Sequence, residues 1–468
     1  MTTLPETPND PVELPLSYSQ QLMRFLEHLH PGEALSEGFY VSSRYRLRGD
    51  LDLEVLQRGF DFVVQRHDAL RSVVVVERGI AFQRVWPEAR ARVRIADALP
   101  EDLTPDQRDE RIAAFFADCE RGRGDDATVP AIWTSVLRVA PQEHLLSIVV
   151  PHIVSDLWSL DLIMDDWAAY CRAERDGAPM PSSMPLQHSD FVRREQGRDA
   201  ADLERRIDYW ARTLEGVNDC GIPIRRTAPD ETGARAVHRC ALGTELTAGL
   251  QQFARRKRSP LFVSLVTAYA VALACVTGLD DIPVISLSIG RDDPALRGLV
   301  SFVANVMMLR GRFVQSMSLE AAHQEMRTVY LGALEHEAPA AVLADAVPDT
   351  ALMMASDNYS VMPFEFVPEP TEATGRDFGG SCSCELVVDD LFDEQSTSHL
   401  LPLDALAMVF ATGDDLVLEV EYATNLFGSD VIAGFSNVFR RVAQLLVDAP
   451  ESTIEDVARS VGPAIRRS

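Results

Sequence analysis

The sequence lacks any excess of positive charge. Its 44 lysine and arginine residues are outnumbered by 71 aspartate and glutamate residues, so the net charge of the 468-residue chain is −27. Such a chain repels phosphate groups, and we therefore expect it to bind neither nucleic acid nor a membrane surface. An acidic protein partner would need a local basic patch, for which the candidates are Arg121 with Arg123, Arg193 with Arg194, and Arg205 with Arg206. Each of these pairs is more commonly part of a solvated surface.

Paired cysteines and a leader segment are also missing. The chain has seven cysteines, an odd number, and only Cys382 and Cys384 lie close together, without the second pair that a tetrahedral metal site needs. We therefore expect free thiols in a reducing cytoplasm, with no metal ion and no cofactor bound. The first residues include no basic start followed by an apolar run, so we expect no signal peptide.

One uncharged run, Leu261–Leu279, is nearly long enough to span a membrane. It is diluted by Ser264 and Thr267, and it leads through two aspartates into the strand-like segment Ile282–Ile289. These features favour a buried helix of a second domain over a membrane anchor.

The length of the chain exceeds what one core usually supports, which predicts two domains. The proline-rich stretch Gly177–Pro185 is typical of a linker and sets the expected domains at residues 1–180 and 181–468. Within the first domain, a strand is predicted over Leu145–Val150 and a helix over Trp158–Ala173. Residues 151–157 then form a strand-to-helix junction, which places side chains at the edge of a sheet.

This junction carries the motif on which a family resemblance depends. Residues 151–159 read PHIVSDLWS and resemble the core motif of the condensation-domain superfamily, His-His-x-x-x-Asp-Gly followed by Trp-Ser. His152 matches the second histidine and Asp156 the aspartate. Pro151 replaces the first histidine and Leu157 replaces the glycine.

Further segments resemble the family in the same order over about residues 15–460. They are Ser17-x-x-Gln20, Arg66-His67-Asp68-Ala69-Leu70-Arg71, Asp208-Tyr209-Trp210, Ile289-Gly290-Arg291, Phe302-Val303-Ala304-Asn305 and Glu421–Phe427. The resemblance implies an α/β (α+β) fold of two chloramphenicol acetyltransferase-like lobes in a V-shaped arrangement, each a mixed sheet flanked by helices. It also implies that the stretch Pro363–Ser398 reaches from the second lobe to the first.

The resemblance assigns a role to each residue of the expected site. His152 would take a proton from the attacking amine or orient that amine, because the unperturbed pKa of histidine is near neutral. Asp156 would form a buried salt bridge with Arg66 or Arg71, although its position also invites a catalytic interpretation. Leu157 would fill the space that glycine leaves beside the histidine, and Pro151 would either end the strand harmlessly or disturb it. The substrate tunnel would be lined by Pro151, Ser155, Leu157, Trp158 and Asn305.

These implications lead to two functional hypotheses. The first is a free-standing enzyme of nonribosomal peptide or antibiotic biosynthesis that joins an acyl thioester to an amine, or less commonly a hydroxyl, on a carrier-bound or small-molecule acceptor. Separate acyl or peptidyl carrier proteins would deliver the phosphopantetheine arm in trans. The second is an inactive condensation-fold protein that binds a carrier protein and recruits another enzyme, which the altered positions 151 and 157 favour. Epimerisation and acyl transfer from coenzyme A remain further uses of the fold.

Overall fold

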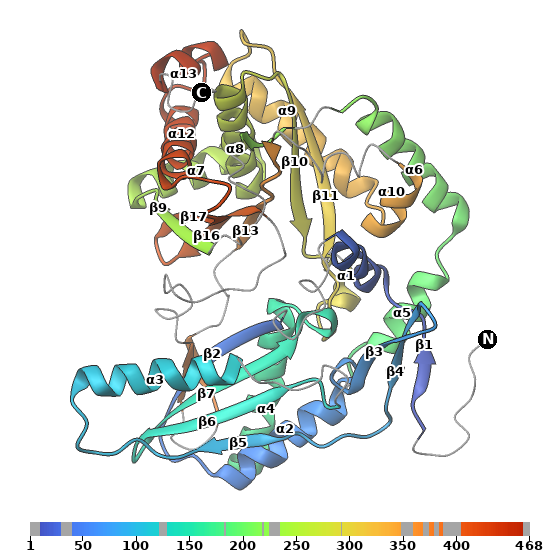
Figure 1. Cartoon of the computed structure of the whole chain (residues 1–468), viewed down its shortest axis with the longest axis vertical. Coiled ribbons are helices and arrows are strands. Elements are labelled where there is room, and N and C mark those ends of the chain that lie inside the picture. Colours follow the sequence, from blue (N-terminus) through green and yellow to red (C-terminus); the bar gives the residue numbers. More distant parts are fainter. Residues whose placement is uncertain are drawn as a thin grey trace. The chain divides into compact units, whose positions relative to one another are not determined.

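The structure of the chain is a computed structural model, which describes residues 10–29, 40–120, 129–181, 184–217, 220–223, 235–291, 293–347, 359–367, 374–378, 383–386 and 404–461. The chain forms two compact units (Figure 1). Unit 1 comprises Met1–Arg198, Ile289–Ala304 and Pro370–Pro402, and unit 2 comprises Asp199–Ser288, Asn305–Glu369 and Leu403–Ser468. The chain therefore passes between the units more than once.

These units differ from the expected domains of residues 1–180 and 181–468. Helix α5 (His188–Gln196) follows the predicted linker, yet it belongs to unit 1 and packs against the 3-10 turn η1 (Asp68–Arg71). Two later segments also return to unit 1, and the second of them, Pro370–Pro402, overlaps the stretch Pro363–Ser398. A local composition signal marks a connection in the chain but does not report which core the following segment joins.

Unit 1 is built around a mixed six-stranded sheet. Its strand order is β14 (Thr374–Asp377), β15 (Ser383–Leu386), β2 (Tyr40–Arg48), β7 (Glu143–Pro151), β6 (Trp133–Ala140) and β5 (Val93–Ala96). Among these described strands, only the β5–β6 pairing is parallel. Alternate side chains of β6 and β7 point to opposite faces of the sheet and enter two separate apolar clusters. Helices α2 (Leu53–Arg66) and α4 (Leu157–Asp176) therefore cover one face, and α3 (Pro105–Glu120) covers the other.

A second, three-stranded sheet of unit 1 has the order β1 (Val12–Leu14), β4 (Ile80–Val85) and β3 (Ser72–Glu77). Helix α1 (Tyr18–Leu29) follows β1 directly. A hairpin turn at Arg78-Gly79 joins β3 to β4, and the two residues have positive φ angles of 51° and 80°. Two consecutive positive φ angles are the usual geometry of a tight hairpin turn.

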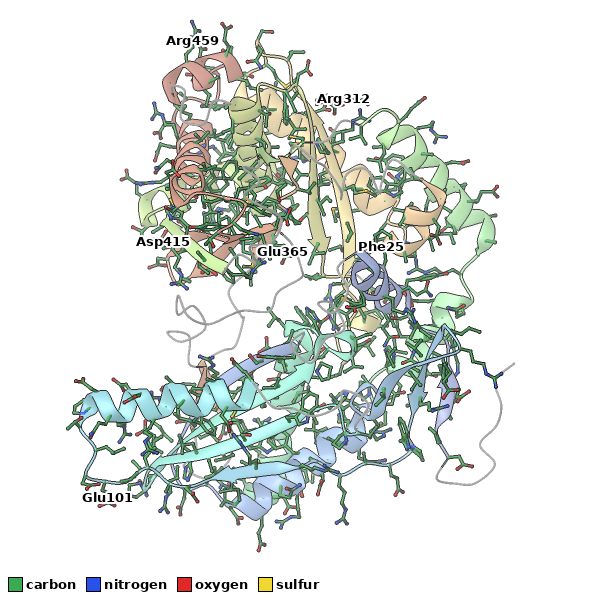
Figure 2. All side chains as sticks on the ribbon, in the orientation of Figure 1. Phe25, Glu101, Arg312, Glu365, Asp415 and Arg459 are labelled. Carbon is green, nitrogen blue, oxygen red and sulfur yellow. The ribbon has the colours of Figure 1, made fainter. Side chains whose placement is uncertain are left out.

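Unit 2 contains a four-stranded mixed sheet, ordered β13 (Phe364–Val367), β16 (Ala405–Thr412), β17 (Asp415–Ala423) and β9 (Arg235–Ala241). Two antiparallel pairs accompany it: β10 (Asp281–Ser288) with β11 (Asn305–Arg312), and β8 (Ile222–Pro223) with β12 (Tyr359–Ser360). The described helices of unit 2 are α6 (Ala200–Leu214), α7 (Thr244–Lys257), α8 (Leu261–Thr277), α9 (Leu319–Glu335), α10 (Ala340–Ala346), α12 (Ser429–Asp448) and α13 (Ile454–Val461). The 3-10 turn η3 (Pro294–Leu296) belongs to unit 1. Asp415, the first residue of β17 (Figure 2), accepts hydrogen bonds from the Gly243 amide (2.8 Å) and the Thr247 hydroxyl (3.1 Å) at the start of α7.

Helix α8 confirms the prediction of a buried helix within Leu261–Leu279. Every residue from Val263 to Ala274 is at most 2% exposed, and the helix ends at Gly278, which has a φ of 74°. Within the described ranges, no single helix is long and apolar enough to cross a membrane; α7 and α8 reach that length only together, across a bend of 109°. The predicted fold class, mixed sheets flanked by helices, is likewise confirmed.

Candidate functional site

His152 lies where strand β7 gives way to helix α4 in unit 1. Pro151 is the last residue of β7 and pairs with Tyr40 of β2, and the 3-10 turn η2 (His152–Val154) follows. The Nδ1 atom of His152 is 2.8 Å from the carbonyl oxygen of Ser155. Because a carbonyl oxygen only accepts hydrogen bonds, Nδ1 carries the proton, and in the neutral ring the lone pair is on Nε2.

Two surroundings of the imidazole act on its orientation and charge. The ring of Phe302 meets it edge-on, with 4.9 Å between the ring centroids. Burial lowers the pKa of His152, while the Ser155 carbonyl and the Asp156 carboxylate act in the opposite direction. The net effect keeps the ring neutral at neutral pH, which is the state that accepts a proton.

Asp156 caps helix α4 and pairs with Arg291. Its Oδ1 atom accepts hydrogen bonds from the backbone N–H (2.8 Å) and hydroxyl (2.7 Å) of Ser159, and Arg291 Nη2 lies 2.9 Å and 2.8 Å from its two carboxylate oxygens. The Arg291 side chain is 1% exposed. Its Nη1 atom donates to the carbonyls of Leu296 (2.6 Å) and Leu299 (2.7 Å), so this ion pair ties the segment 289–304 to the motif.

The structural role expected of Asp156 is therefore supported, but the expected partners Arg66 and Arg71 are wrong. Arg66 Nε donates to Asp166 (2.9 Å), whose same oxygen lies 2.8 Å from His67 Nε2. Arg71 donates to backbone carbonyls, among them that of Val64 at 2.6 Å. The reason is helical rise: Asp166 lies ten residues beyond Asp156 on α4, so the end of α2 meets that helix about 15 Å from the cap.

The other motif positions of unit 1 differ in exposure. Pro151 and Ser155 are buried, and the Ser155 hydroxyl donates to the Asp156 carbonyl at 3.3 Å. Leu157 is 55% exposed, which is not the burial expected of a side chain that closes the space beside His152. Trp158 is 41% exposed, and its indole N–H donates to the Arg297 carbonyl at 2.9 Å.

Asn305, predicted to line the tunnel, is the first residue of β11 in unit 2. Its amide nitrogen donates to the Ala338 carbonyl (2.9 Å) and to Glu337 (3.2 Å), and its amide oxygen accepts from the Ala340 backbone N–H (3.0 Å). Both ends of the side chain thus hold the start of α10. The remaining residues of the predicted tunnel set belong to unit 1.

Sequence reasoning missed Arg291, Ser159, Ser301 and Phe302 as parts of this site. Arg291 and Phe302 stand within segments that resemble the family, but the chain pattern contains no signal that residues 289–304 return to the first unit. The basic pairs predicted for a partner are partly neutralised: Arg193 pairs with Asp190 (3.0 Å), and Asp202 serves both Arg205 and Arg206 (2.8 Å each). Arg121, Arg123 and Cys382 lie outside the described residues.

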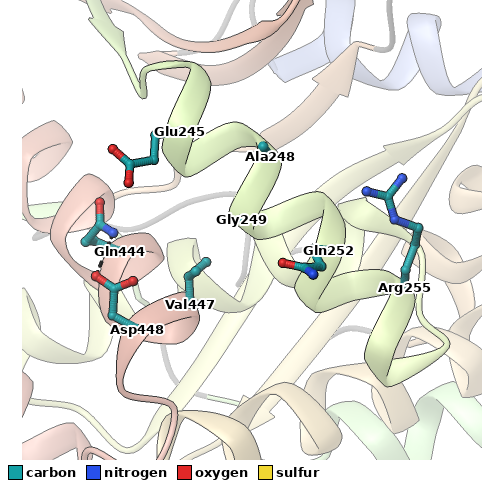
Figure 3. A pocket seen from close by; sticks show the side chains of 8 residues that line it. All are labelled: Glu245, Ala248, Gly249, Gln252, Arg255, Gln444, Val447 and Asp448. Carbon is teal, nitrogen blue, oxygen red and sulfur yellow. Dashed lines mark hydrogen bonds between the residues drawn. The ribbon is translucent and has the colours of Figure 1, made fainter.

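A surface pocket of about 580 Å³ lies apart from these residues, within unit 2 (Figure 3). It is formed between α7 and α12 and lined by Glu245, Ala248, Gly249, Gln252, Arg255, Gln444, Val447 and Asp448. None of the predicted site residues contributes to it. In the described part of the chain, no group of three or more histidine, cysteine, aspartate or glutamate side chains could hold a metal ion.

Comparison with known proteins finds relatives of this chain among large synthases. Chondramide synthase cmdD of Chondromyces crocatus is 26% identical over 457 residues, which make up 95% of this chain and 11% of that protein. Enniatin synthase of Fusarium equiseti is 26% identical over 459 residues, or 94% of this chain and 14% of that protein. The chain thus spans a small part of the length of these relatives.

Solved structures share the fold. The SgcC5 protein from Streptomyces globisporus matches with a TM-score of 0.81 at 23% identity, over 94% of this chain and 100% of that chain. The X-domain from teicoplanin biosynthesis matches with a TM-score of 0.76 at 18% identity, over 97% and 98%. The sequence model of the condensation domain matches residues 12–459. By this match over most of its length, the chain belongs to the condensation domain family.

Proposed function

We propose that this chain is an acyltransferase that joins a carrier-bound acyl thioester to an amine acceptor, with His152 as the proton acceptor. The observation that carries the proposal is the hydrogen bond of Nδ1 to the Ser155 carbonyl, which leaves the lone pair of the neutral ring on Nε2. Separate carrier proteins would present the acyl group on a phosphopantetheine thiol. A hydroxyl acceptor would react by the same route and depend more strongly on the base.

The reaction needs only one proton to be managed. The amine nitrogen forms a bond to the thioester carbonyl carbon, His152 Nε2 accepts the proton that the nitrogen loses, and the carbon–sulfur bond breaks. The departing sulfur then receives a proton from the imidazolium. Alignment of the two substrates supplies much of the acceleration, up to about 7–11 kcal/mol for well-held reactants. The lowered pKa of His152 fits this cycle, because the ring begins neutral and returns its proton readily.

The test is mass-spectrometric detection of product with loaded donor carrier and acceptor, for the parent and two variants. His152→Ala is expected to lower product formation by roughly 10²- to 10⁴-fold while leaving carrier affinity intact. Leu157→Gly is expected to retain turnover, because it removes an exposed apolar side chain and no polar group. Equal product from the parent and His152→Ala would remove His152 from the chemistry.

A second function, recruitment of another protein, is favoured by the exposed Leu157 and Trp158 and by one similar structure, a complex of the X-domain and OxyB from teicoplanin biosynthesis. Exposed apolar side chains at one place often mark a protein contact. Under this alternative no pairing of donor and acceptor yields product. His152→Ala then changes neither partner binding nor pathway output.

A further inference from the structure

His188, at the start of α5, is fully buried and makes polar contacts with both ends of its ring. Its Nε2 atom lies 2.7 Å from Gln83 Oε1, and its Nδ1 atom lies 2.7 Å from the Ser301 hydroxyl oxygen. Its backbone N–H donates to Asp68 Oδ1 at 2.8 Å. Neither the linker prediction nor the motif gave this histidine a role.

The proton position on His188 follows from its neighbours. Gln83 donates its amide N–H to the Pro15 carbonyl at 2.8 Å, so its amide oxygen faces the histidine. That oxygen can only accept, and Nε2 of His188 therefore carries the proton. The neutral ring then accepts at Nδ1 from the hydroxyl of Ser301. Burial lowers the pKa of His188, which favours this neutral form.

Ser301 connects His188 to the surroundings of His152. Its backbone N–H donates to the Ser159 hydroxyl oxygen (3.1 Å), whose own proton goes to Asp156, and its carbonyl accepts from Arg291 Nη2 (3.1 Å). The next residue, Phe302, places its ring against the imidazole of His152. A shift of Ser301 would therefore move the aromatic wall of the site.

Gln20 lies on the other side of His188: its amide nitrogen donates to the carbonyl of Ile153 at 3.2 Å and is 3.5 Å from His188 Nε2, a packing contact between two donors. Ile153 directly follows His152. The Gln20 amide oxygen also accepts from the backbone N–H of Ser17 at 2.9 Å. His188 thus stands between two residues that hold opposite sides of the motif loop, and all of them belong to unit 1.

We propose that His188 is a positioning residue for His152: by accepting the Ser301 hydroxyl hydrogen bond, it holds Phe302 against the imidazole and so fixes the orientation of the proton-accepting ring. This inference rests on the proposed function of His152. The proposed role differs from a merely structural one because the orientation of His152 should depend on Nδ1 of His188, which accepts from Ser301, and not on Nε2.

Two substitutions separate the two ring nitrogens. In His188→Asn the amide oxygen stands near the position of Nδ1 and can still accept from Ser301, whereas the contact with Gln83 is lost. In His188→Gln the amide nitrogen stands near Nε2 and can still donate to Gln83, whereas the Ser301 bond is lost. Each variant leaves one buried partner unsatisfied, so we expect similar losses of melting temperature. Ser301→Ala breaks the same bond from its other end.

For the full-length chain, we expect His188→Gln and Ser301→Ala to lower kcat by roughly 10- to 100-fold with little change in KM, because misplacement of a reacting group acts on the chemical step. His188→Asn should stay within about threefold of the parent. His323→Asn is the matched control: this histidine is 1% exposed and lies 3.3 Å from the Ser264 hydroxyl in unit 2. It should lower stability without changing kcat.

The second readout does not need activity. Nitrogen-15 NMR of the histidine rings, with the His152 signals assigned by their loss in His152→Ala, reports the tautomer and order of that ring. We expect one Nδ1-protonated tautomer in the parent and in His188→Asn, and an averaged ring in His188→Gln and Ser301→Ala. If the parent makes no product but these spectra differ as expected, the proposed chemistry fails and the positioning role stands. Equal His152 spectra, or equal losses of kcat, in His188→Asn and His188→Gln would overturn the positioning role.

Discussion

The surroundings of the candidate site in unit 1 differ from the surroundings of helix α8 in unit 2. Around the candidate site of unit 1, buried polar groups from distant parts of the sequence, including Gln20, His188 and Arg291, form hydrogen bonds with backbone carbonyls and with other polar side chains. The centre of unit 2 is α8, which is apolar on all sides and packs against α9 and α12. Apolar cores accept volume-conserving changes of side chain, whereas a hydrogen-bonded polar network favours one arrangement of its members. The polar groups of unit 1 therefore fix the position of the motif loop around His152, whereas α8 contributes to the stability of unit 2.

The largest effect on stability is expected when the polar network of unit 1 loses a charge. Asp156→Ala should lower the free energy of unfolding by about 3–5 kcal/mol, because the Arg291 side chain remains buried without its carboxylate. Urea denaturation followed by circular dichroism measures this change. Asp202→Ala, which removes the partner of Arg205 and Arg206 on an exposed helix face, is the control and should cost less than about 1 kcal/mol. An Asp156→Ala protein as stable as the parent yet inactive would make Asp156 part of the chemistry instead.

A cavity in unit 2 should weaken the protein without disturbing the site. Leu265 on α8 is fully buried, so Leu265→Ala should lower the free energy of unfolding by about 2–5 kcal/mol in the same assay. The His152 ring signals should stay as in the parent. Leu331→Ala, at an α9 position that is 46% exposed, serves as the matched control and should change little. Altered His152 signals in Leu265→Ala would show that the two interiors are coupled and would break the comparison.

The smallest effect concerns a buried carboxyl group. Burial raises the pKa of Glu195 in unit 1 to about 7, although its Oε2 atom accepts the Tyr18 backbone N–H at 3.0 Å. The folded protein therefore holds this proton more tightly than the unfolded chain, and the stability linked to it is complete below about pH 4.5 and lost as the pH rises to about 7. Glu195→Gln keeps the hydrogen bond, so it should be more stable than the parent by about 1–3 kcal/mol at pH 8 and equal to it at pH 4.

Glu365 in unit 2 (Figure 2) supplies the comparison for that measurement. Surrounding protein atoms also raise the pKa of Glu365 to about 7, but part of its side chain remains exposed to solvent. Glu365→Gln should give a gain of the same sign and smaller size, since solvent screens the charge. Thermal melting of both variants between pH 4 and pH 8 decides the matter. A gain that does not depend on pH would contradict the titration argument for either residue.

Features encoded by neighbouring residues could be predicted from the sequence. Asp52 caps α2 by accepting hydrogen bonds from the Glu54 (2.8 Å) and Val55 (3.1 Å) amides, and aspartate before an apolar helical pattern is a common cap. The turn at Arg78-Gly79 and the buried helix α8 were likewise evident, because φ preference and apolar composition act over a few residues. For Asp156, its place before a helix favoured a structural role, and the resemblance implied an ion pair, which the structure has with Arg291 and not with Arg66 or Arg71.

Contacts between residues far apart in the sequence could not be predicted. The partner of Asp156 is 135 positions away at Arg291, and the contact of His188 with Ser301 spans 113. No local pattern reports such pairings, and the proline-rich stretch before His188 indicated a domain boundary that α5 does not respect. Leu157 was expected to fill the space beside His152, and its exposure to solvent was missed, since the size of a side chain does not say where that side chain points. Long-range contacts, rather than residue type, decide these parts of the site.

The return of β14 and β15 to unit 1 constrains when that unit can fold during synthesis. Strand β2 has β7 on one side, and its other side pairs with β15, whose last residue is Leu386. At the usual rates of translation, roughly 10–50 s separate the emergence of β7 from that of β15. During that time β2 presents an open edge, which is a site for pairing with another chain. Nascent copies on one messenger therefore risk joining through β2, and a chain that ends before Leu386 is expected to aggregate rather than to yield a free first unit.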